Sequence, residues 1–450
     1  MRLAIAVLAL TLLAGAAHAE DPAAHWQQVS EAGVASANAG DLAAAEASFR
    51  EALALSEQLP QGDPRRATSA NNLGFVLYAQ GRTREALPYY ADALSLRDAT
   101  LGPTHPVTAQ SLNNLAEALR IDGQREQAEQ LHRRAIEIRR TRLAPDHPDL
   151  AESLNNLGVL LTDERRFDEA QALFADALAI RIKALGERHS AVAEVKSNLG
   201  ALAFARGDYA EAEKRQRDVL ATEEAVRSPG DPEIAVALGN LAQVLMAEGQ
   251  PQEAAALLDR ALALRLAALG PDRLETAQSR HALALALIGL GQAERAQGLL
   301  EESMAATGRL LGPGSPELVP LLKDLAGLRE DHGDYALALP LQQQATTIEE
   351  TNYGAADARV ALTLNNLALL QGELGAWRDA DALLARAVGI EETALGPDSA
   401  ELTTTLENRA AVLDRLDRRE EAQALRQRAA AIRVASAARE SGAAPASAAP

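Results

Sequence analysis

The segment Leu101-Gly-Pro-Thr-His-Pro-Val-Thr-Ala-Gln-Ser-Leu-Asn-Asn-Leu115 explains the organisation of the chain, because its first six residues recur at multiples of 42 residues. Copies of this motif begin at residues 143, 185, 269, 311 and 395, and more divergent copies begin at 59, 227 and 353. Nine copies therefore keep one register without insertion or deletion. A period of this length predicts an array of small helical units, each of which packs mainly against its neighbours.

Each unit is expected to contain a helix, a tight turn and a second helix. Apolar residues in segments such as 112–119 follow the i, i+3, i+4, i+7 spacing of an amphipathic helix. The first helix is predicted to begin in the linker, where the expected N-caps are Asp63, Asp231, Ser315, Asp357 and Ser399. At the turn, Arg165 and Asp417 take the place of a glycine that recurs at positions 81, 123, 207, 249, 291, 333 and 375.

Small residues recur at two positions of the second helix. Alanine stands at position 86 and again at 93, and most later units repeat it in register. Small side chains allow helices to approach closely, and enlarging one would overpack the contact. An interior of alanine and leucine is consistent with an aromatic content of only 3%.

The spacing of these small residues resembles the tetratricopeptide repeat. Gly74, Ala86 and Ala93 match its Gly/Ala, Ala and Ala positions, and the 42-residue period with Leu-Gly-Pro-x-His-Pro and Leu112-Asn-Asn-Leu115 is similar to the kinesin-light-chain variety. The resemblance covers residues 59–435. It implies an all-α fold, a right-handed α-solenoid of stacked antiparallel helix pairs, whose first helices line a groove that binds extended peptides or other proteins. Two features differ from kinesin light chains: the N-terminal residues predict a signal peptide, as described next, and acidic residues exceed basic ones. No motor or cargo function is therefore carried over.

The flanking segments have different compositions. Residues 1–19 combine Arg2, an apolar run and Ala17-His-Ala19, which predicts a signal peptide cleaved after Ala19 and a periplasmic or secreted protein. Residues 20–58 are expected to form a degenerate capping helix pair that turns at Gly40-Asp41. Residues 436–450, rich in Ala, Ser and Pro, are expected to be disordered. No later segment is apolar enough for stable membrane insertion.

Composition excludes several classes of function. The absence of cysteine excludes disulfides and thiolate metal sites. With 44 Lys and Arg against 63 Asp and Glu, and a net charge of -19, the chain is not expected to bind nucleic acid. His105, His147 and His189 recur in register, but neighbouring copies are too far apart to share one metal ion, so they are interpreted as helix caps. No catalytic or cofactor motif is present, and the chain is expected to be neither an enzyme nor a cofactor or metal protein.

An asparagine recurs just before a core leucine of the first helix, and we call this place the ladder position. Asparagine within a helix is less favourable than alanine by roughly 0.6 kcal/mol, so its recurrence needs a compensating cause. Either the amide bonds to the neighbouring repeat, or it binds the backbone of a peptide ligand; both interpretations stay open. The candidate peptide-binding residues are Asn72, Asn114, Asn156, Asn198 and Asn240 at the ladder position, and Asn71, Asn113 and Asn155 immediately before it.

Acidic residues are expected to outnumber basic ones around the ladder, which favours a neutral or basic ligand segment. The residues on which this depends are Glu117, Arg120, Glu152, Asp163, Glu194, Glu330, Asp331, Glu373, Asp414 and Arg415. The basic run from His132 to Arg142 is expected to be a solvated outer face. The sequence therefore predicts a non-enzymatic protein-protein interaction scaffold of the cell envelope or secreted space, with a monomer favoured. The alternative is a structural or assembly subunit that acts through self-association or its convex face.

Overall fold

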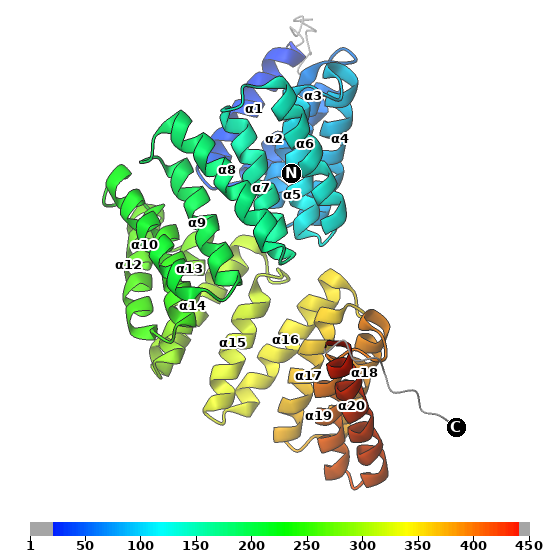
Figure 1. Ribbon diagram of the computed structural model, residues 1–450. Helices are drawn as coiled ribbons and strands as arrows, with labels where there is room; N and C mark the ends of the chain where they lie inside the picture. The colour runs from blue at the N-terminus through cyan, green and yellow to red at the C-terminus, as the bar shows by residue number, and fades with distance from the viewer. Residues whose placement is uncertain (1–20, 441–450) are drawn as a thin grey trace, which may run out of the picture. The chain divides into compact units, whose positions relative to one another are not determined.

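The computed structural model describes residues 21–440, so the predicted signal peptide and residues 441–450 lie outside the described part of the chain. Across the described residues the secondary structure consists of α-helices, with no strand (Figure 1). The expectation of an all-α repeat solenoid is confirmed. The chain divides into two compact units, of which the first ends at Arg206 and the second begins at Gly207.

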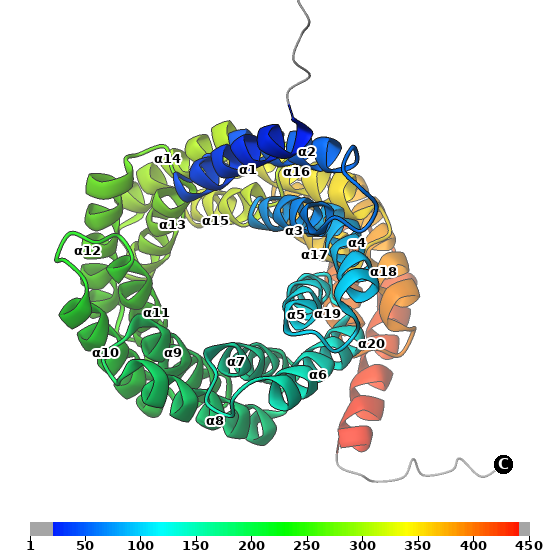
Figure 2. The ribbon, with the colours of Figure 1, turned by 90° about the horizontal axis from the view of Figure 1, so that it is seen from above.

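Unit 1 contains nine described helices. Their bounds are α1 Pro22–Asn38, α2 Leu42–Ser56, α3 Pro64–Ala79, α4 Thr83–Leu101, α5 Pro106–Ile121, α6 Arg125–Arg142, α7 Pro148–Asp163, α8 Phe167–Leu185 and α9 Ser190–Ala205. The odd-numbered helices are the first helices of successive pairs, and within unit 1 α3 contacts α5, α5 contacts α7, and α7 contacts α9. In Figure 2, α3, α5 and α7 line the inner side of unit 1, and α4, α6 and α8 lie outside them.

Unit 2 repeats this arrangement with eleven described helices. Their bounds are α10 Tyr209–Val226, α11 Ile234–Ala247, α12 Pro251–Leu269, α13 Leu274–Gly289, α14 Ala293–Leu311, α15 Leu318–Asp331, α16 Tyr335–Tyr353, α17 Ala358–Glu373, α18 Trp377–Leu395, α19 Leu402–Arg415 and α20 Arg419–Glu440. Here α11, α13 and α15 lie inside α12, α14 and α16 (Figure 2). The last helix, α20, continues through Glu440, beyond the predicted end of the repeats at residue 435.

Linker residues cap the first helices much as the sequence predicts. The side chain of Asp63 accepts a hydrogen bond from the backbone N–H of Arg65 at 3.0 Å. The three in-register histidines are caps as well, because the Nδ1 atoms of His105, His147 and His189 each accept from the N–H two residues on, at 3.1 Å. The expectation was wrong by two residues at α11, α15 and α19, which begin after an extra turn that follows Asp231, Ser315 and Ser399.

The turn glycines all have a positive φ, and so do the two residues that replace them. Gly81 has φ 77° and Gly123 has φ 88°, in the left-handed region where glycine carries no steric penalty. Arg165 and Asp417 keep the same conformation, with φ 61° and 58°. A side chain in this region costs of order 1 kcal/mol, so the repeat geometry overrides the local preference at these two turns.

Small residues let the two helices of a pair touch, as expected. The side chains of Ala86 and Ala93 are completely buried, and the equivalent alanines of later units are also buried. A second contact within the helix pair depends on volume exchange, by which we mean that a smaller residue on one helix faces a larger residue on the other. Where the first helix has glycine, as at Gly74 and Gly158, the second helix has an aromatic ring above it; a Cβ on Gly158 would lie 2.6 Å from the ring of Phe174. Where the first helix has alanine instead, the facing residue is leucine in three units: Ala242 with Leu258, Ala284 with Leu300, and Ala368 with Leu384.

The basic run of α6 contains two buried side chains, which corrects the expectation of a solvated outer face. His132 and Arg139 are both 0% exposed. The guanidinium of Arg139 donates to the carbonyl oxygen of Asp149 at 2.6 Å, to Ser153 Oγ at 2.8 Å and to Gln110 Oε1 at 2.6 Å. These acceptors lie on α5 and α7, on either side of α6. A buried charge is tolerated because its hydrogen bonds are supplied by the neighbouring repeats.

Arginines in the same register make the same contacts elsewhere, and we call Arg97, Arg139, Arg181 and Arg265 the arginine series. Each donates to the first helix of the following pair. Arg97 bonds to Ser111 Oγ at 2.7 Å, Arg181 to the carbonyl oxygen of Ala191 at 2.6 Å, and Arg265 to Ser279 Oγ at 2.8 Å. The series therefore links consecutive helix pairs within each unit.

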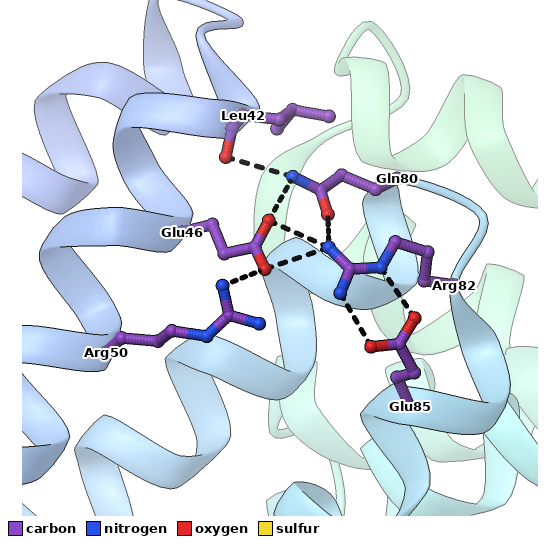
Figure 3. Close-up of polar contacts among 6 residues, drawn as sticks. All are labelled: Leu42, Glu46, Arg50, Gln80, Arg82 and Glu85. Atoms are coloured by element: carbon purple, nitrogen blue, oxygen red, sulfur yellow. Dashed lines mark hydrogen bonds and ion pairs between the residues drawn. The ribbon is translucent and has the colours of Figure 1, made fainter. Parts of the chain in front are cut away.

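A polar cluster links α2, α3 and α4 in unit 1 (Figure 3). The guanidinium of Arg82 donates to Glu46 at 2.8 Å and to Glu85 at 2.7 Å, while Gln80 donates to Glu46 at 2.9 Å. Burial acts to raise the pKa of Glu46, but the hydrogen bonds from Gln80 and Arg82 outweigh it and lower this pKa below its usual value. The equivalents of Glu46, Arg82 and Glu85 in two other repeats form the same kind of cluster. One consists of Glu129, Arg166 and Glu169, and the other of Asp381, Arg418 and Glu421.

The volume exchange can be tested by swapping residue pairs between units. We expect Gly158→Ala to lower the free energy of unfolding by about 1–2 kcal/mol, because overlap with Phe174 outweighs the better helix propensity of alanine. Adding Phe174→Leu should recover most of this loss, since Ala with Leu is the combination in three other units. Urea unfolding of both single variants and the double variant measures the coupling. Purely additive effects would show that the two positions do not compete for space.

The buried imidazole makes stability depend on pH. Burial lowers the pKa of His132 to about 4, although the charge of Glu117 opposes this shift. An unfolded histidine takes up a proton near pH 6.5, so the folded state loses stability as the pH falls from 6.5 toward 4, by about 3 kcal/mol in total. We expect His132→Gln, which cannot titrate, to flatten this dependence.

Unit 1 can be followed by the fluorescence of Trp26 during urea unfolding if Trp377 in unit 2 is replaced by phenylalanine. The chain has two tryptophans, so the Trp377→Phe protein carries a single fluorophore. The free energy of unfolding of the Trp377→Phe protein is compared with that of the same protein carrying His132→Gln as the pH falls. Parallel decreases would mean that His132 takes up a proton in the folded protein as readily as in the unfolded one.

Candidate functional site

The candidate site is the exposed surface of the first helices around the ladder position. Residues four before and three after a ladder residue lie on the same side of an α-helix as that residue. We call this surface the inner face. In the first repeat it consists of Thr68, Asn72 and Phe75 on α3, which are partly buried or exposed. It carries the asparagines that the sequence singles out, and each unit has its own inner face.

Several of the candidate amides are engaged between repeats. Asn114 donates from Nδ2 to Asn71 Oδ1 at 2.8 Å, and Asn198 donates to Asn155 Oδ1 at 2.8 Å. In unit 2, Asn408 bonds to Asn365 in the same way at 2.9 Å. The amide at a ladder position thus bonds to the residue before the ladder position of the preceding pair. This arrangement favours the structural interpretation for the bonded residues.

A fourth pair in the same register has different chemistry. At the step from α13 to α15, the residues are His281 and Asp324, whose Nε2 and Oδ2 atoms are 2.5 Å apart. Both members depart from asparagine together, and the contact between helices is kept. Replacement of both asparagines by another polar pair is expected if the contact between α13 and α15 requires two polar side chains that bond to each other, rather than two amides that bind a ligand.

Two of the predicted binding residues have no accessible surface to offer. Asn113 is 1% exposed and Asn155 is 3% exposed. Asn113 donates to Ser153 Oγ at 2.8 Å, and its Oδ1 lies 3.1 Å from Nδ1 of His132. Asn155 donates to Glu194 at 3.2 Å in addition to accepting from Asn198. A peptide on the inner face cannot reach these side chains in this conformation, so a structural role is favoured for both.

Asn72 and Asn156 differ from the other candidates. Both are partly exposed on the inner face, and within the described part of unit 1 neither side chain has a hydrogen-bond partner. Asn156 is left without one because Asn113, its counterpart in the preceding pair, points toward Ser153 and His132. Asn240, on α11, is also partly exposed. Asn72 and Asn156 are therefore the amides in unit 1 whose ligand-binding role stays a prediction.

Exposed apolar side chains flank the ladder, and the sequence reasoning missed them. Phe75 is 52% exposed and Val34, at the equivalent place on α1, is 46% exposed. In unit 2, Leu362 and Leu369 flank Asn366 at 59% and 42% exposure. Val236 and Leu285 occupy equivalent positions on α11 and α13 at 46% and 41% exposure. The 42-residue register contains these apolar residues at positions where other repeats have charged residues.

The acidic residues of the unit 1 inner face are largely neutralised. Arg120 donates to Glu117 at 2.8 Å and also pairs with Asp163. Burial acts to raise the pKa of Glu117, but the hydrogen bond and charge of Arg120 lower it overall. Glu152 pairs with Arg139 at 3.0 Å and Glu194 with Arg181 at 2.9 Å. The arginine series thus compensates the charge that the sequence assigned to this surface.

The acidic excess persists in unit 2. Glu330, Asp331 and Glu373 have no basic partner within residues 207–440. Burial and the neighbouring Asp331 raise the pKa of Glu330. Of the other two predicted residues, Asp414 pairs with Arg426, and the guanidinium of Arg415 lies 4.5 Å from the centroid of the Trp377 ring. Of the acidic residues on which the charge prediction depends, those without a basic partner therefore lie in unit 2.

A groove of about 600 Å³ lies between α1 and α3 on the unit 1 inner face. Its lining includes the ladder residue Asn72 and Val34 from the apolar set. The backbones of α1 and α3 pack less closely than those of α3 and α5 or of α5 and α7. The groove therefore lies at the step where two first helices are not in close contact.

The two interpretations of the amides can be separated by their effect on stability. We expect Asn113→Ala to lower the free energy of unfolding by about 1–3 kcal/mol, because it leaves the buried Nδ1 of His132 without a partner and removes one of the two hydrogen bonds to Ser153 Oγ. Asn156→Ala should change it by less than about 0.6 kcal/mol, since no internal bond is lost and alanine is the better helix former. Thermal and urea unfolding of the two variants give the comparison. Equal destabilisation would mean that Asn156 has a structural partner after all.

Comparison with known proteins agrees with the repeat geometry. The tetratricopeptide repeat family matches residues 30–97, 65–141, 130–179, 149–224 and 233–307, and a second tetratricopeptide repeat description matches residues 360–401. No curated protein matches the sequence. Solved structures with similar folds include kinesin-light-chain-like proteins.

BtubC (BKLC) from P. vanneervenii is 26% identical over 50% of this chain and 91% of its own, with a TM-score of 0.42. A putative kinesin light chain with nearly identical TPR-like repeats from Podosopora anserina is 28% identical over 46% of this chain and 97% of its own, with a TM-score of 0.38. A Rap protein complexed with competence and sporulation factor is 16% identical over 73% of this chain and 98% of its own, with a TM-score of 0.48. Because the family matches extend over more than half of its residues, the chain belongs to the tetratricopeptide repeat family.

Proposed function

We propose that this protein is a non-enzymatic interaction scaffold that binds an extended segment of a partner protein along the inner face of its first helices. The observation that carries the proposal is the exposed apolar set beside the ladder, namely Val34, Phe75, Val236, Leu285, Leu362 and Leu369. Exposed apolar side chains that gather on one face are typical of interaction surfaces. Their position on the first helices agrees with the general use of this repeat family as protein-protein interaction scaffolds.

An extended ligand suits the spacing of the inner face. Packed helices lie roughly 9 Å apart, and an extended chain advances roughly 3.3 Å per residue. Each first helix would therefore meet about every third ligand residue. Asn72 and Asn156 can each donate to and accept from a peptide backbone, and the apolar residues beside them would hold side chains.

The charge of the inner face supports a neutral or basic ligand. Along α5, α7 and α9 the carboxylates of Glu117, Asp163, Glu152 and Glu194 are paired, so an uncharged apolar segment meets no penalty there. In unit 2 the unpaired Glu330, Asp331 and Glu373 would attract lysine or arginine. An acidic segment would be repelled, which makes ligand charge a direct test of this part of the proposal.

We place the protein in the periplasm or outside the cell, on the strength of the apolar run and the Ala17-His-Ala19 site in the sequence. Among the described helices, none has the length and apolar character needed to cross a bilayer. Within residues 21–440 no group of three or more acidic or histidine side chains is arranged to hold a metal ion. Tetratricopeptide repeat proteins are typically non-enzymatic, and the proposal assigns no catalysis to this one.

The alternative, an assembly subunit, has a surface of its own. Leu101, Leu185 and Leu395 are the last residues of α4, α8 and α18, and they are 41%, 38% and 46% exposed. They lie outside the inner face and recur in register. Self-association through these leucines would give a mass that rises with concentration, whereas peptide binding on the inner face favours a monomer.

The proposal is tested by affinity capture from the native envelope fraction with matched surface variants in unit 1. We expect Phe75→Glu to abolish retention of a partner, because a charge replaces an apolar contact on the inner face. Asn156→Ala should weaken retention several-fold, through loss of about 1 kcal/mol of hydrogen bonding. Leu185→Glu, at the end of α8, is the matched control and should have no effect.

The opposite pattern would favour the alternative. If Leu185→Glu abolished capture or reduced the mass measured by light scattering, while Phe75→Glu did neither, assembly through the second helices would replace binding on the inner face. Circular dichroism of each variant confirms that the helices are intact.

A further inference from the structure

At the groove between α1 and α3, as at the step from α5 to α7, the described residues lack the hydrogen bond that the ladder residue makes at the other two steps of unit 1. The places on α1 are found by counting back 41 residues, since Gly33 lies under Phe49 as Gly74 lies under Tyr90. Ser30 is therefore the counterpart of Asn71. At the following step, Asn71 receives a bond from the ladder residue Asn114. The corresponding bond, between Asn72 and Ser30, is not made.

Both members of the unmade pair line the groove. Ser30 is 8% exposed, and its Oγ has no hydrogen-bond partner in the described structure. The amide of Asn72 is also unpartnered there. A buried hydroxyl without a partner costs free energy, so a ligand that supplies one gains the bond without breaking another. Together, the hydroxyl and the amide offer donors and acceptors suited to a peptide backbone.

Apolar side chains form the rest of the lining. Trp26 is held in place because its indole Nε1 donates to Ser69 Oγ on α3 at 2.7 Å. Val34 and Ala35 complete an apolar surface along α1. A volume of about 600 Å³ accommodates a large apolar side chain with a short length of backbone. The fixed indole provides a flat surface against which such a side chain can pack.

The charge at the groove is negative. Glu31 lines it, is exposed, and accepts a hydrogen bond from Gln27 at 2.9 Å without any basic partner among the described residues. The nearby guanidinium of Arg65 is 5.8 Å from the centroid of the Trp26 ring, but it is paired with both carboxylate oxygens of Asp63. A cationic side chain on the ligand would therefore find an available carboxylate in Glu31.

We infer that this groove binds a short extended segment of a partner protein in which a large apolar residue is followed by lysine or arginine. The apolar side chain packs on Trp26 and Val34, the backbone bonds to Ser30 and Asn72, and the cation pairs with Glu31. The inference deepens the proposed function, on which it rests for the peptide nature of the ligand. It specifies the chemical character of the bound segment and places that segment at the α1–α3 end of the unit 1 inner face.

Trp26 fluorescence tests this assignment in the full-length Trp377→Phe protein. The probes are two blocked peptides, acetyl-Gly-Ser-Ala-Ala-Leu-Lys-Ala-Ser-Gly-amide and the same peptide with Glu in place of Lys. We expect the Lys peptide to change the Trp26 emission with saturation and to bind about fivefold more tightly than the Glu peptide. Isothermal titration calorimetry with the same peptides gives a second measurement that does not depend on the fluorophore.

Three variants assign the contacts. Glu31→Gln should erase the difference between the two peptides. Asn72→Ala should weaken both by between about twofold and tenfold, through loss of a hydrogen bond. Gln127→Ala is the control, because this exposed amide lies on the second helix α6 and does not line the groove; it should leave binding at Trp26 unchanged.

Several results would overturn the inference. These are a lack of saturable binding by either method, equal affinity for both peptides in the wild-type groove, or an effect of Gln127→Ala as large as that of Asn72→Ala. Competition by a synthetic peptide of residues 441–450 would identify the chain's own C-terminal segment as the occupant. A drop in molecular mass caused by Val34→Glu would identify a second copy.

The outcome is separable from that of the proposed function. If these peptides fail while Phe75→Glu still abolishes partner capture, the groove assignment falls and the inner face stands. If the peptides bind as expected while Phe75→Glu leaves capture intact, the scaffold proposal loses its support and the groove remains a peptide site of unassigned purpose.

Discussion

Close contact between small residues is the constraint on which the rest of the structure depends. A buried alanine stands at one position of every described second helix and at a second position of all of them but α10 and α14, which have Val219 and Ser303 there; these alanines fix how far apart the two helices lie. Because that separation repeats every 42 residues, every polar contact between neighbouring pairs can recur with the same spacing. The asparagine pairs, the arginine series and the polar clusters, one of which Figure 3 shows, all follow from this regular separation. A larger residue at Ala86 or Ala93 would disturb these contacts as well as the local packing.

The role of an amide in this array depends on the preceding helix pair as much as on its own. Asn114 and Asn156 occupy the same position, yet Asn114 bonds to Asn71 while Asn156 has no such partner. The difference arises because Asn113 is drawn away by His132 and Ser153. Binding capacity on the inner face is therefore set where a contact between repeats is interrupted. The same reasoning applies to Asn72, whose potential partner is a shorter serine.

Sequence periodicity predicts the helix pairs, the turns, the buried alanines and the histidine caps, because each of these is fixed by local geometry and repeats in register. It does not predict that His132 and Arg139 are buried, since burial of a polar group depends on acceptors supplied by another repeat. It also assigns eight asparagines to a ligand without resolving which ones bond to each other. The exposed apolar residues beside the ladder were visible in the register, but their exposure follows only from how closely successive first helices pack.

The arginine series has a consequence for how such arrays can grow or be rebuilt. Each of these arginines is anchored on the first helix of the following pair, so the polar interactions of a second helix are completed outside its own hairpin. A hairpin copied alone into a new place would leave its guanidinium without the acceptors that the following first helix supplies. The self-sufficient module for duplication, recombination or engineering is therefore a second helix together with the first helix that follows it. Exchange points within the turn of a hairpin would preserve this module, and exchange points in the Leu-Gly-Pro linkers would divide it.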